Sequence, residues 1–336
     1  MEVIILFKKR WFSLLLVIIP ALTACGTTSS AEEVKVFRFA YASNSQPVKD
    51  SMALFGELVE EKSNGTMKVD FYPDSQLGGE TDLIQLTQTG AIDFTKVSGA
   101  ALEGFSEYYS IFGIPYLFDD EESFFKVMED DSIMDQIYGS TSDLGFSGIT
   151  YYDSGQRSFY MVDGPVETPD DLQGKKIRTM ESETAVKMMS LLGGSAVPMG
   201  SDEVYASLQS GLIDGSENNE FVLVTAGHGN VAKYYSYDQH TRIPDIIIMN
   251  DERLAGLTEE EKDIIMDSAA ESTEYEKEVF NDAVEKEKEA AAADYNVEFN
   301  EVDSEPFREL VAPIAEEFEN DEILGELYNE IIEAQK

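Results

Sequence analysis

The segments LTQTGAIDF, residues 86–94, and LQSGLIDG, residues 208–215, follow the same plan. In each, the end of a helix leads to a glycine suited to the left-handed backbone conformation, then to an apolar pair and an aspartate that opens a strand. Helix-glycine-strand connections are common in α/β proteins, so a chance match is the alternative. The simplest explanation is a chain of two lobes of similar construction, which would bind a ligand in the crevice beyond the strand ends.

The sequence around these segments alternates strands with helices. The pattern predicts strands at 34–40, 67–71 and 175–179, and helices at 48–62, 168–174 and 183–192. A βαβ order indicates mainly parallel sheets with helices on their faces. Beyond residue 257 the pattern changes, because residues 258–292 are rich in glutamate and alanine and lack glycine and proline. We expect one long helix there, and one or two more over 307–335.

Composition limits the class of protein. With 336 residues, of which 43% are hydrophobic, the chain can bury a sizeable core. The 66 acidic residues outnumber the 24 basic ones, for a net charge of -42. This balance argues against nucleic acid or an anionic membrane surface as a partner, since both require a basic footprint. Capture of an anion would depend on a few well-placed cations, because the long-range field opposes it.

The N-terminus has the order of an export signal. Basic residues at 8–10 precede an apolar run over 11–19, and small residues follow before Cys25, the only cysteine of the chain. The segment LTAC that ends at Cys25 resembles the lipobox of bacterial lipoproteins, which implies a diacylglyceryl group on this cysteine. An uncleaved transmembrane anchor is the weaker alternative, since the run is short for a bilayer span. We expect a signal peptide at 1–24 and a polar tether over 25–33.

Signals for catalysis and metal binding are poor. The sequence lacks a Gly-x-Ser-x-Gly elbow, a phosphate loop, paired cysteines and a His-Glu-x-x-His motif. The two histidines, His228 and His240, do not have the spacing of a metal pair, and the acidic run over 119–122 lacks the ligand order of an EF-hand. We therefore expect no enzyme, no cofactor and no metal ion.

Two arginines are the best candidates for a binding site. Arg157 lies in SGQRSF, and Arg178 lies at the end of the predicted strand in KKIRTM. A guanidinium offers a planar fork of donors to carboxylate oxygens, and one charge-assisted contact of that type contributes roughly 1.5 to 3 kcal/mol. For any single arginine a structural ion pair is the default alternative. Two of them in one predicted lobe favour an anion site.

Four motifs carry a family resemblance. They are SQLGGETDLI at 75–84, GQR at 155–157, DLQGKKIR at 171–178 and PMGSDEVYASLQSGLIDGSEN at 198–218. Together they resemble the substrate-binding proteins of TRAP transporters, the DctP type, over nearly the whole chain after the signal. The resemblance implies a two-lobed α/β fold like that of periplasmic binding proteins, with a hinge and a long helix spanning both lobes. It implies a first lobe at 34–154 plus about 244–283 and a second at 155–243 plus about 284–336.

The resemblance also implies transport without chemistry. Two lobes would close over an organic acid and hand it to one small and one large membrane subunit, driven by a sodium or proton gradient. The protein would be an exported monomer held by its lipid on the outer face of the bacterial cytoplasmic membrane, which is periplasmic in a Gram-negative cell.

The same resemblance implies roles for site residues. Arg178 would pair with the ligand carboxylate, Arg157 would be the second arginine of the site, and Asn218 would hydrogen-bond the ligand. Ser98 and Ser201 stand where sialic-acid-binding members carry an acidic and an aromatic residue, which argues against sialic acid. Candidates for hydroxyl partners or a stacking face are Asn219, Glu80, Gln46, His228, Tyr151 and Tyr152.

The expected ligand is a sugar acid. The segment 217–245 is similar to members associated with uronic acids, so glucuronate and galacturonate are the leading candidates. A C4-dicarboxylate, with one carboxylate on Arg157 and one on Arg178, is the first alternative. A secreted hydrolase and the receptor of an ATP-driven importer are the outside alternatives.

Overall fold

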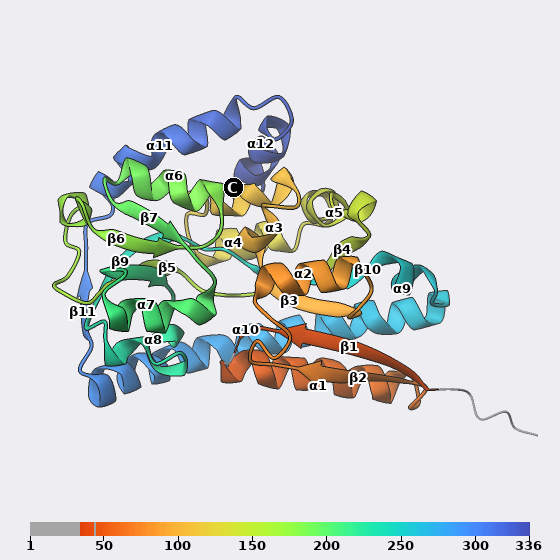
Figure 1. The fold of residues 1–336 in the computed structure, drawn as a ribbon. Coiled ribbons are helices and arrows are strands. Elements are labelled where there is room, and N and C mark those ends of the chain that lie inside the picture. Colours follow the sequence, from red (N-terminus) through yellow and green to blue (C-terminus); the bar gives the residue numbers. More distant parts are fainter. Residues whose placement is uncertain (1–33, 44) are drawn as a thin grey trace, which may run out of the picture. The chain divides into compact units, whose positions relative to one another are not determined.

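The computed structural model describes residues 34–43 and 45–336, so the predicted signal peptide, Cys25 and the tether lie outside the described residues. The described part forms two sheets flanked by helices (Figure 1). The first sheet has the strand order β2 (Met67–Tyr72), β1 (Lys35–Tyr41), β3 (Phe94–Ser98), β10 (Asp245–Asn250) and β4 (Phe146–Tyr152). The second has the order β11 (Glu298–Glu301), β9 (Tyr234–Thr241), β5 (Arg157–Met161), β8 (Gly215–Asn218), β6 (Lys176–Thr179) and β7 (Ser195–Pro198).

Both sheets are mixed, but only one strand in each runs against the others, β10 in the first and β5 in the second, so the prediction of mainly parallel sheets is confirmed. β1 pairs in parallel with β2 and β3, as the βαβ pattern predicts. In contrast, β10 runs antiparallel to β3 and β4, and β5 runs antiparallel to β8 and β9. A parallel neighbour requires a long crossover. β5 and β10 instead enter their sheets from the other sheet, over the short links 153–156 and 242–244.

Helices flank each sheet, and α1 and α6 lie close to the helices predicted at 48–62 and 183–192. Those beside the first sheet are α1 (Gln46–Lys62), α2 (Glu80–Gln88), α3 (Gly99–Leu102), α4 (Glu121–Met128), α5 (Asp131–Gly139) and α9 (Asp251–Ala255). Those beside the second are α6 (Glu183–Leu191), α7 (Val204–Ser210) and α8 (Phe221–Thr225). Short 3-10 turns are η1 (Glu107–Gly113), η2 (Ser142–Leu144), η3 (Pro169–Leu172), η4 (Ser201–Glu203) and η5 (His228–Asn230). The predicted helix over 168–174 is only the turn η3.

The two segments that follow the same plan, 86–94 and 208–215, also make corresponding hydrogen bonds. Gly90 and Gly211 both take the left-handed conformation, with φ of 70° and 73°. Asp93 accepts the backbone N–H of Arg38 at 2.7 Å, and Asp214 accepts that of Lys176 at 2.8 Å. In both copies the aspartate thus joins the start of its strand to the neighbouring parallel strand. The shared geometry supports two similarly built lobes over a chance match.

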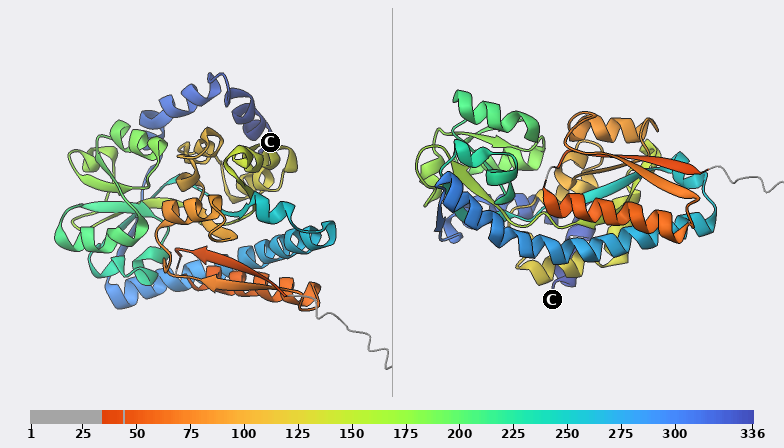
Figure 2. Two further views of the ribbon diagram at one scale, coloured as in Figure 1. Left: turned by 45° about the vertical axis from the view of Figure 1, so that its right-hand side comes forward. Right: turned by 90° about the horizontal axis from the view of Figure 1, so that it is seen from below.

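The long helix α10 (Glu259–Tyr295) runs along both sheets (Figure 2). It has 37 residues and begins with a capping box between Thr258 and Glu261. Near its start Ile265 packs in the core of the first sheet, and near its end Ala291 packs in the core of the second. The helix predicted at 258–292 is therefore confirmed, including its position across both sheets.

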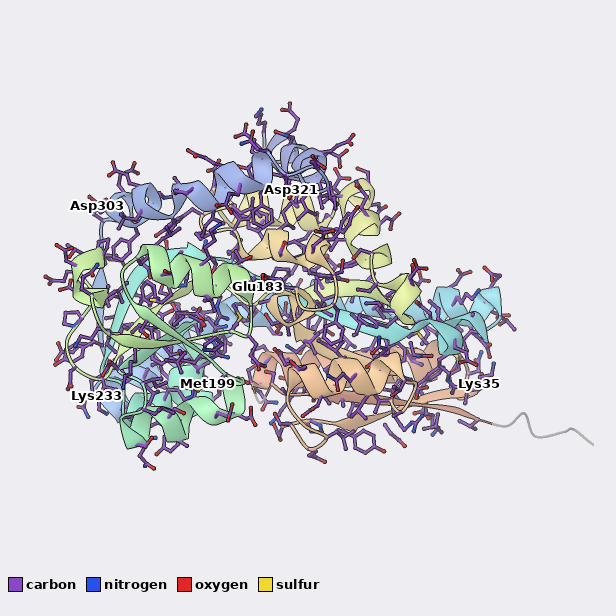
Figure 3. The ribbon with its side chains drawn as sticks, turned by 45° about the horizontal axis from the view of Figure 1, so that its top comes forward. Lys35, Glu183, Met199, Lys233, Asp303 and Asp321 are labelled. Carbon is purple, nitrogen blue, oxygen red and sulfur yellow. The ribbon has the colours of Figure 1, made fainter. Side chains whose placement is uncertain are left out.

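The C-terminal helices α11 (Glu305–Glu319) and α12 (Gly325–Ala334) also span the two halves. α11 packs on α6, whereas α12 packs on α4 and α5. Figure 3 shows Asp303 and Asp321 near the two ends of α11, with charged side chains projecting outward from these helices. None of the helices in the described ranges is long and apolar enough to cross a membrane.

Candidate functional site

A cavity of about 660 Å³ lies at the strand ends of both sheets. The first sheet contributes side chains from the ends of β3 and the start of β10, and the second contributes them from β5, β6 and β8. The volume is within the range of roughly 300 to 1,000 Å³ usual for small-molecule sites. The crevice thus lies where the sequence predicts it.

Most of the predicted ligand residues line this cavity, namely Arg157, Arg178, Asn218, Asn219, Glu80, Ser98, Ser201 and His228. The predicted residues on α1 and β4 lie elsewhere. Gln46 donates its amide to Asp50 Oδ1 at 2.7 Å on the exposed side of α1. Tyr152 is fully buried in the core of the first sheet, where its hydroxyl donates to Ser272 Oγ at 3.0 Å. Tyr151 is buried as well, with Lys277 Nζ 5.5 Å from its ring centroid.

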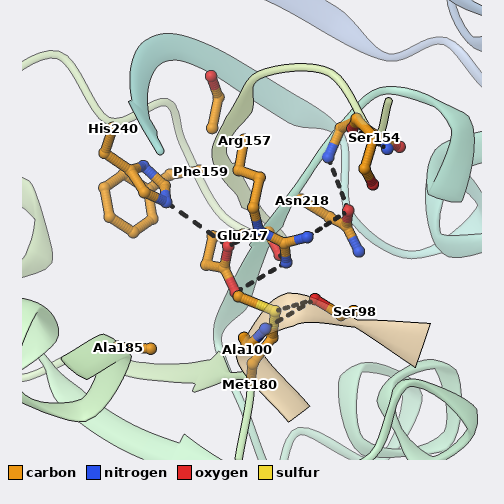
Figure 4. Close-up of polar contacts among 12 residues, drawn as sticks. Ser98, Ala100, Ser154, Arg157, Phe159, Met180, Ala185, Glu217, Asn218 and His240 are labelled. Atoms are coloured by element: carbon orange, nitrogen blue, oxygen red, sulfur yellow. Dashed lines mark hydrogen bonds and ion pairs between the residues drawn. The ribbon is translucent and has the colours of Figure 1, made fainter. Parts of the chain in front are cut away.

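Arg157 is engaged by a carboxylate of its own chain (Figure 4). Its Nε donates to Glu217 Oε2 at 2.7 Å and its Nη2 donates to Glu217 Oε1 at 3.1 Å. Nη1 donates to Asn218 Oδ1 at 3.0 Å. Burial lowers the pKa of Arg157, but the Glu217 charge outweighs this and raises it. The fork of Arg157 is therefore already paired bidentately, and its charge is compensated.

His240 and Asp238 extend this network. His240 stacks on Phe159, with ring centroids 4.6 Å apart, and its Nδ1 lies 2.7 Å from Asp238 Oδ2. Its Nε2 lies 3.5 Å from Glu217 Oε2. Burial lowers the pKa of His240, but Asp238 and Glu217 raise it to about 9. Burial raises the pKa of Glu217, but Arg157 and His240 lower it to about 2. Two cations and two anions thus form a buried, neutral group behind the cavity.

Arg178 is held differently. Its Nε and Nη2 donate to the backbone carbonyl of Met199 at 3.1 and 2.9 Å. Its Nη1 lies 3.9 Å from Glu217 Oε1, which is too far for a hydrogen bond. Burial lowers the pKa of Arg178, although an arginine stays charged at any ordinary pH. Within residues 34–43 and 45–336, this guanidinium keeps one edge without a hydrogen bond to protein.

The two asparagines have different positions in this network. Asn218 Oδ1 accepts from Arg157 Nη1 and, at 2.8 Å, from the Asn219 backbone N–H, so the Nδ2 donor of Asn218 remains for a ligand. Asn219 donates from Nδ2 to the Ser154 carbonyl at 2.7 Å and accepts from the Phe221 N–H at 3.2 Å. Both ends of its amide are engaged, and it fixes the link 153–156 beside the cavity.

His228 contributes a neutral polar group. Its Nδ1 lies 2.8 Å from the Tyr160 hydroxyl, and its buried Nε2 has no hydrogen-bond partner in the part of the chain that the structure describes. Burial and then the charge of Arg178 lower its pKa to about 4. Near neutral pH the ring is uncharged, with one nitrogen left for a ligand.

The opposite wall contains two residues that sequence reasoning missed, Lys96 and Asp245, beside the predicted Glu80 and Ser98. Lys96 on β3 forms an ion pair with Asp245 at the start of β10, and both line the cavity. Glu80, the first residue of α2, accepts the Ser98 backbone N–H at 3.0 Å. Ser98 also donates to Met180 Sδ at 3.7 Å, a contact that links the two sheets across the cavity (Figure 4). A lysine in the otherwise apolar or hydroxylated strand FTKVS was the available signal.

Metal binding finds no support in the described ranges, which contain no group of three or more His, Cys, Asp or Glu side chains able to hold an ion. The polar groups of the cavity are instead donors and acceptors arranged around Arg178, the one lining cation of the described residues without a carboxylate within hydrogen-bonding distance. Such a set can bind and orient a small anion.

Comparisons with known proteins find relatives over most of this chain. The family model described as bacterial extracellular solute-binding protein, family 7, matches residues 39–321. The uncharacterized protein YiiZ of Salmonella typhimurium is 49% identical over 296 residues, which are 88% of this chain and 90% of that protein. The 2,3-diketo-L-gulonate-binding periplasmic protein YiaO of Escherichia coli is 29% identical over 260 residues, which are 77% of this chain and 78% of that protein.

Solved structures that are similar to this chain are also solute-binding proteins. A TRAP periplasmic solute-binding protein of Anaerococcus prevotii with bound D-glucuronate is 43% identical, with a TM-score of 0.87 over 89% of this chain and 98% of that one. One from Xanthobacter autotrophicus with bound β-D-galacturonate is 31% identical, with a TM-score of 0.83 over 88% of this chain and 98% of that one. These neighbours are binding proteins of two-lobed α/β fold, as the sequence predicts for this chain.

Proposed function

Because the chain belongs to the bacterial extracellular solute-binding proteins of family 7, as its motifs predict, we propose that its cavity captures a sugar acid, a uronate such as glucuronate or galacturonate. One observation carries this proposal. Among the described cations that line the cavity, Arg178 alone has no carboxylate within hydrogen-bonding distance, since its nearest lies 3.9 Å away. The ligand carboxylate binds at its open edge.

The pairing of the other cations favours a single negative charge on the ligand. Arg157 is paired with Glu217, Lys96 with Asp245, and Lys49 with Asp74 at 2.9 Å. A C4-dicarboxylate held by both arginines would have to displace Glu217 from Arg157, leaving a buried carboxylate without its partner. The uronate is therefore the better ligand, and the C4-dicarboxylate is the weaker alternative.

The remaining polar groups suit hydroxyls. Asn218 Nδ2 and His228 Nε2 are uncharged and have no hydrogen-bond partner among the described residues. A hydroxyl can donate and accept, so it pairs with such groups without a charge to neutralise. The bound glucuronate and galacturonate in the related structures are consistent with this ligand class.

The mechanism that we propose is capture and delivery. The lobes at 34–154 plus about 244–283 and 155–243 plus about 284–336 would close over the acid by bending at the links 153–156 and 242–244. Asp153 and Arg242, which pair through Arg242 Nε at 3.1 Å, tie these two links together. The closed monomer would then pass the acid to the small and large membrane subunits of a TRAP transporter.

The anchor is a separate proposal. The protein would be held at the outer face of the cytoplasmic membrane by a lipid on Cys25. Cys25→Ser should leave the affinity for the acid unchanged and should abolish membrane attachment or processing. Mass spectrometry of the wild-type N-terminus, together with fractionation of both proteins, checks this, and a wild type without lipid on Cys25 would contradict it.

Calorimetric titration of the purified protein tests the proposed function. D-Glucuronate or D-galacturonate should bind at least tenfold more tightly than succinate. Equal or tighter binding of succinate would replace the uronate with the C4-dicarboxylate. Turnover of a uronate glycoside by the purified protein would support a hydrolase instead.

A further inference from the structure

The ion pair between Lys96 and Asp245 lies in an unusual place for a charged pair. Lys96 is in the middle of β3, where its side chain is 3% exposed, and that of Asp245 is 13% exposed. β3 and β10 are antiparallel neighbours in the centre of the first sheet, with Asp245 opposite Ser98. Burying two charges costs free energy that their attraction seldom exceeds, so such a pair is weak evidence for a role in stability. Because the pair lines the cavity, a role in ligand binding explains it better than a role in stability.

A second acidic group stands beside this pair. The Glu80 carboxyl lines the same wall, held by the Ser98 N–H at 3.0 Å. Burial, and then the charge of Asp245, raise the pKa of Glu80, whereas Lys96 and Arg178 act in the opposite direction. The wall therefore has one cation whose charge Asp245 already neutralises, and the direction of the Glu80 pKa shift indicates surroundings that disfavour further negative charge.

We propose that Lys96, Asp245 and Glu80 form the specificity-determining wall of the cleft, which accepts a hydroxylated end of the ligand and rejects a second carboxylate. This inference rests on the proposed function, in which Arg178 takes the first carboxylate. The ligand class that the wall excludes is the dicarboxylic sugar acids.

The chemistry of the wall explains the selection. Lys96 Nζ has donors beyond the one used by Asp245, and the oxygens of Asp245 and Glu80 are acceptors. A ligand hydroxyl can accept from the lysine and donate to a carboxylate at the same time. A ligand carboxylate can only accept, and it would lie beside the Asp245 charge in a buried site where like charges repel strongly.

D-Glucuronate and D-glucarate are suitable probes, because both are six-carbon sugar acids and only D-glucarate has a second carboxylate. D-Gluconate, which is acyclic like D-glucarate but has one carboxylate, is the control for the open ring. The unmodified protein should bind D-glucuronate at least tenfold more tightly than D-glucarate by calorimetry. Equal affinities, or a preference for D-glucarate, would overturn the proposal without any variant being needed.

The variant Asp245→Asn tests the residues. It removes one negative charge and frees the Lys96 cation, so the preference for D-glucuronate over D-glucarate should fall at least tenfold. The matched control is Asp135→Asn on the exposed side of α5, outside the residues that line the cavity, which makes the same change in net charge. The control should retain the wild-type preference. An unchanged preference in Asp245→Asn, or an equal fall in both variants, would overturn the proposal.

Different outcomes contradict the proposed function and the specificity wall. If D-glucuronate does not bind, or if Arg178→Ala binds it as well as the wild type does, the proposed function fails. If D-glucuronate binding depends on Arg178 and the preference does not depend on Asp245, only the specificity wall fails. Melting curves of each variant show that the compared proteins are folded.

Discussion

The two walls of the cleft have similar side chains but use them differently. The wall from the second sheet has Arg157 and Arg178 with one carboxylate, Glu217, between them. The wall from the first sheet has the cation Lys96 with two acidic neighbours, Asp245 and Glu80. One wall thus retains an uncompensated positive charge, and the other retains none. The charge of the ligand that the cleft accepts is therefore determined by the cations that lack a carboxylate partner, and not by the number of basic residues.

The largest expected effect comes from breaking the ion pair behind the second wall. Glu217→Gln leaves the buried Arg157 without its counter-ion, which should lower the free energy of unfolding by about 3 to 5 kcal/mol. Urea unfolding of the variant and the wild type measures this. Arg178→Ala is the contrasting variant, because Arg178 has no carboxylate partner to leave unpaired, and its stability should change far less. Equal losses in both would remove the distinction between the two arginines.

The next effect concerns binding. Arg178→Lys keeps the charge but loses the planar pair of donors, so affinity for D-glucuronate should fall at least tenfold, or about 1.4 kcal/mol. Arg178→Ala should lose more. Calorimetric titration of the three proteins measures the difference. Affinities within a factor of two of one another would mean that the carboxylate binds elsewhere, and Arg157 would be the next residue to test.

A smaller effect is expected at Asn218. Asn218→Asp keeps the acceptor for Arg157 but replaces the Nδ2 donor by a charged oxygen beside the captured anion. Affinity for D-glucuronate should fall about fivefold, close to the 1 kcal/mol of one hydrogen bond. Titration of the variant at neutral pH tests this, with melting curves as the control for folding. An affinity equal to that of the wild type would place the ligand away from Asn218.

The smallest effects are expected in the dependence of stability on pH. Glu217 has a pKa of about 2 when folded, against 4.5 for an unperturbed glutamate, so its contribution to stability is present above pH 4.5 and is lost as pH falls toward 2. His240 has a folded pKa of about 9, against 6.5 for an unperturbed histidine, so its contribution to stability is present below pH 6.5 and is lost as pH rises through 9.

Unfolding at a series of pH values measures both contributions. The stability difference between the wild type and Glu217→Gln should shrink at acid pH, and that between the wild type and His240→Asn should shrink at alkaline pH. Differences that stay constant with pH would contradict the network that joins these two residues.

Local sequence rules predicted most of the fold. Gly90, Gly211 and the capping box at Thr258 act within a few residues, so their signals are readable in one sequence. The pairing of charges is not local. Glu217 is 60 residues from Arg157, and Lys96 is 149 residues from Asp245. The sequence therefore identified both arginines but could not show which of them is already paired.

Two of the three predicted residues that lie outside the cavity illustrate the same limit. Gln46 and Tyr152 have polar groups that suit a sugar, but Asp50 and Ser272 already bind them. Asp50 is one helical turn from Gln46 and could have been noticed as an i, i+4 neighbour. Ser272 is on α10, 120 residues from Tyr152, and no local pattern connects the two.

The helix α10 gives the molecule an elastic element. Its 37 residues form a rod of about 55 Å at 1.5 Å per residue. Ordinary helices curve with radii of roughly 60 to 100 Å without losing hydrogen bonds, so a rod of this length can bend by some tens of degrees within the normal range. A closing motion can therefore be stored as curvature along the whole helix instead of as a break at one residue. Once the solute has left, the curved α10 would straighten and would return the lobes to their open arrangement.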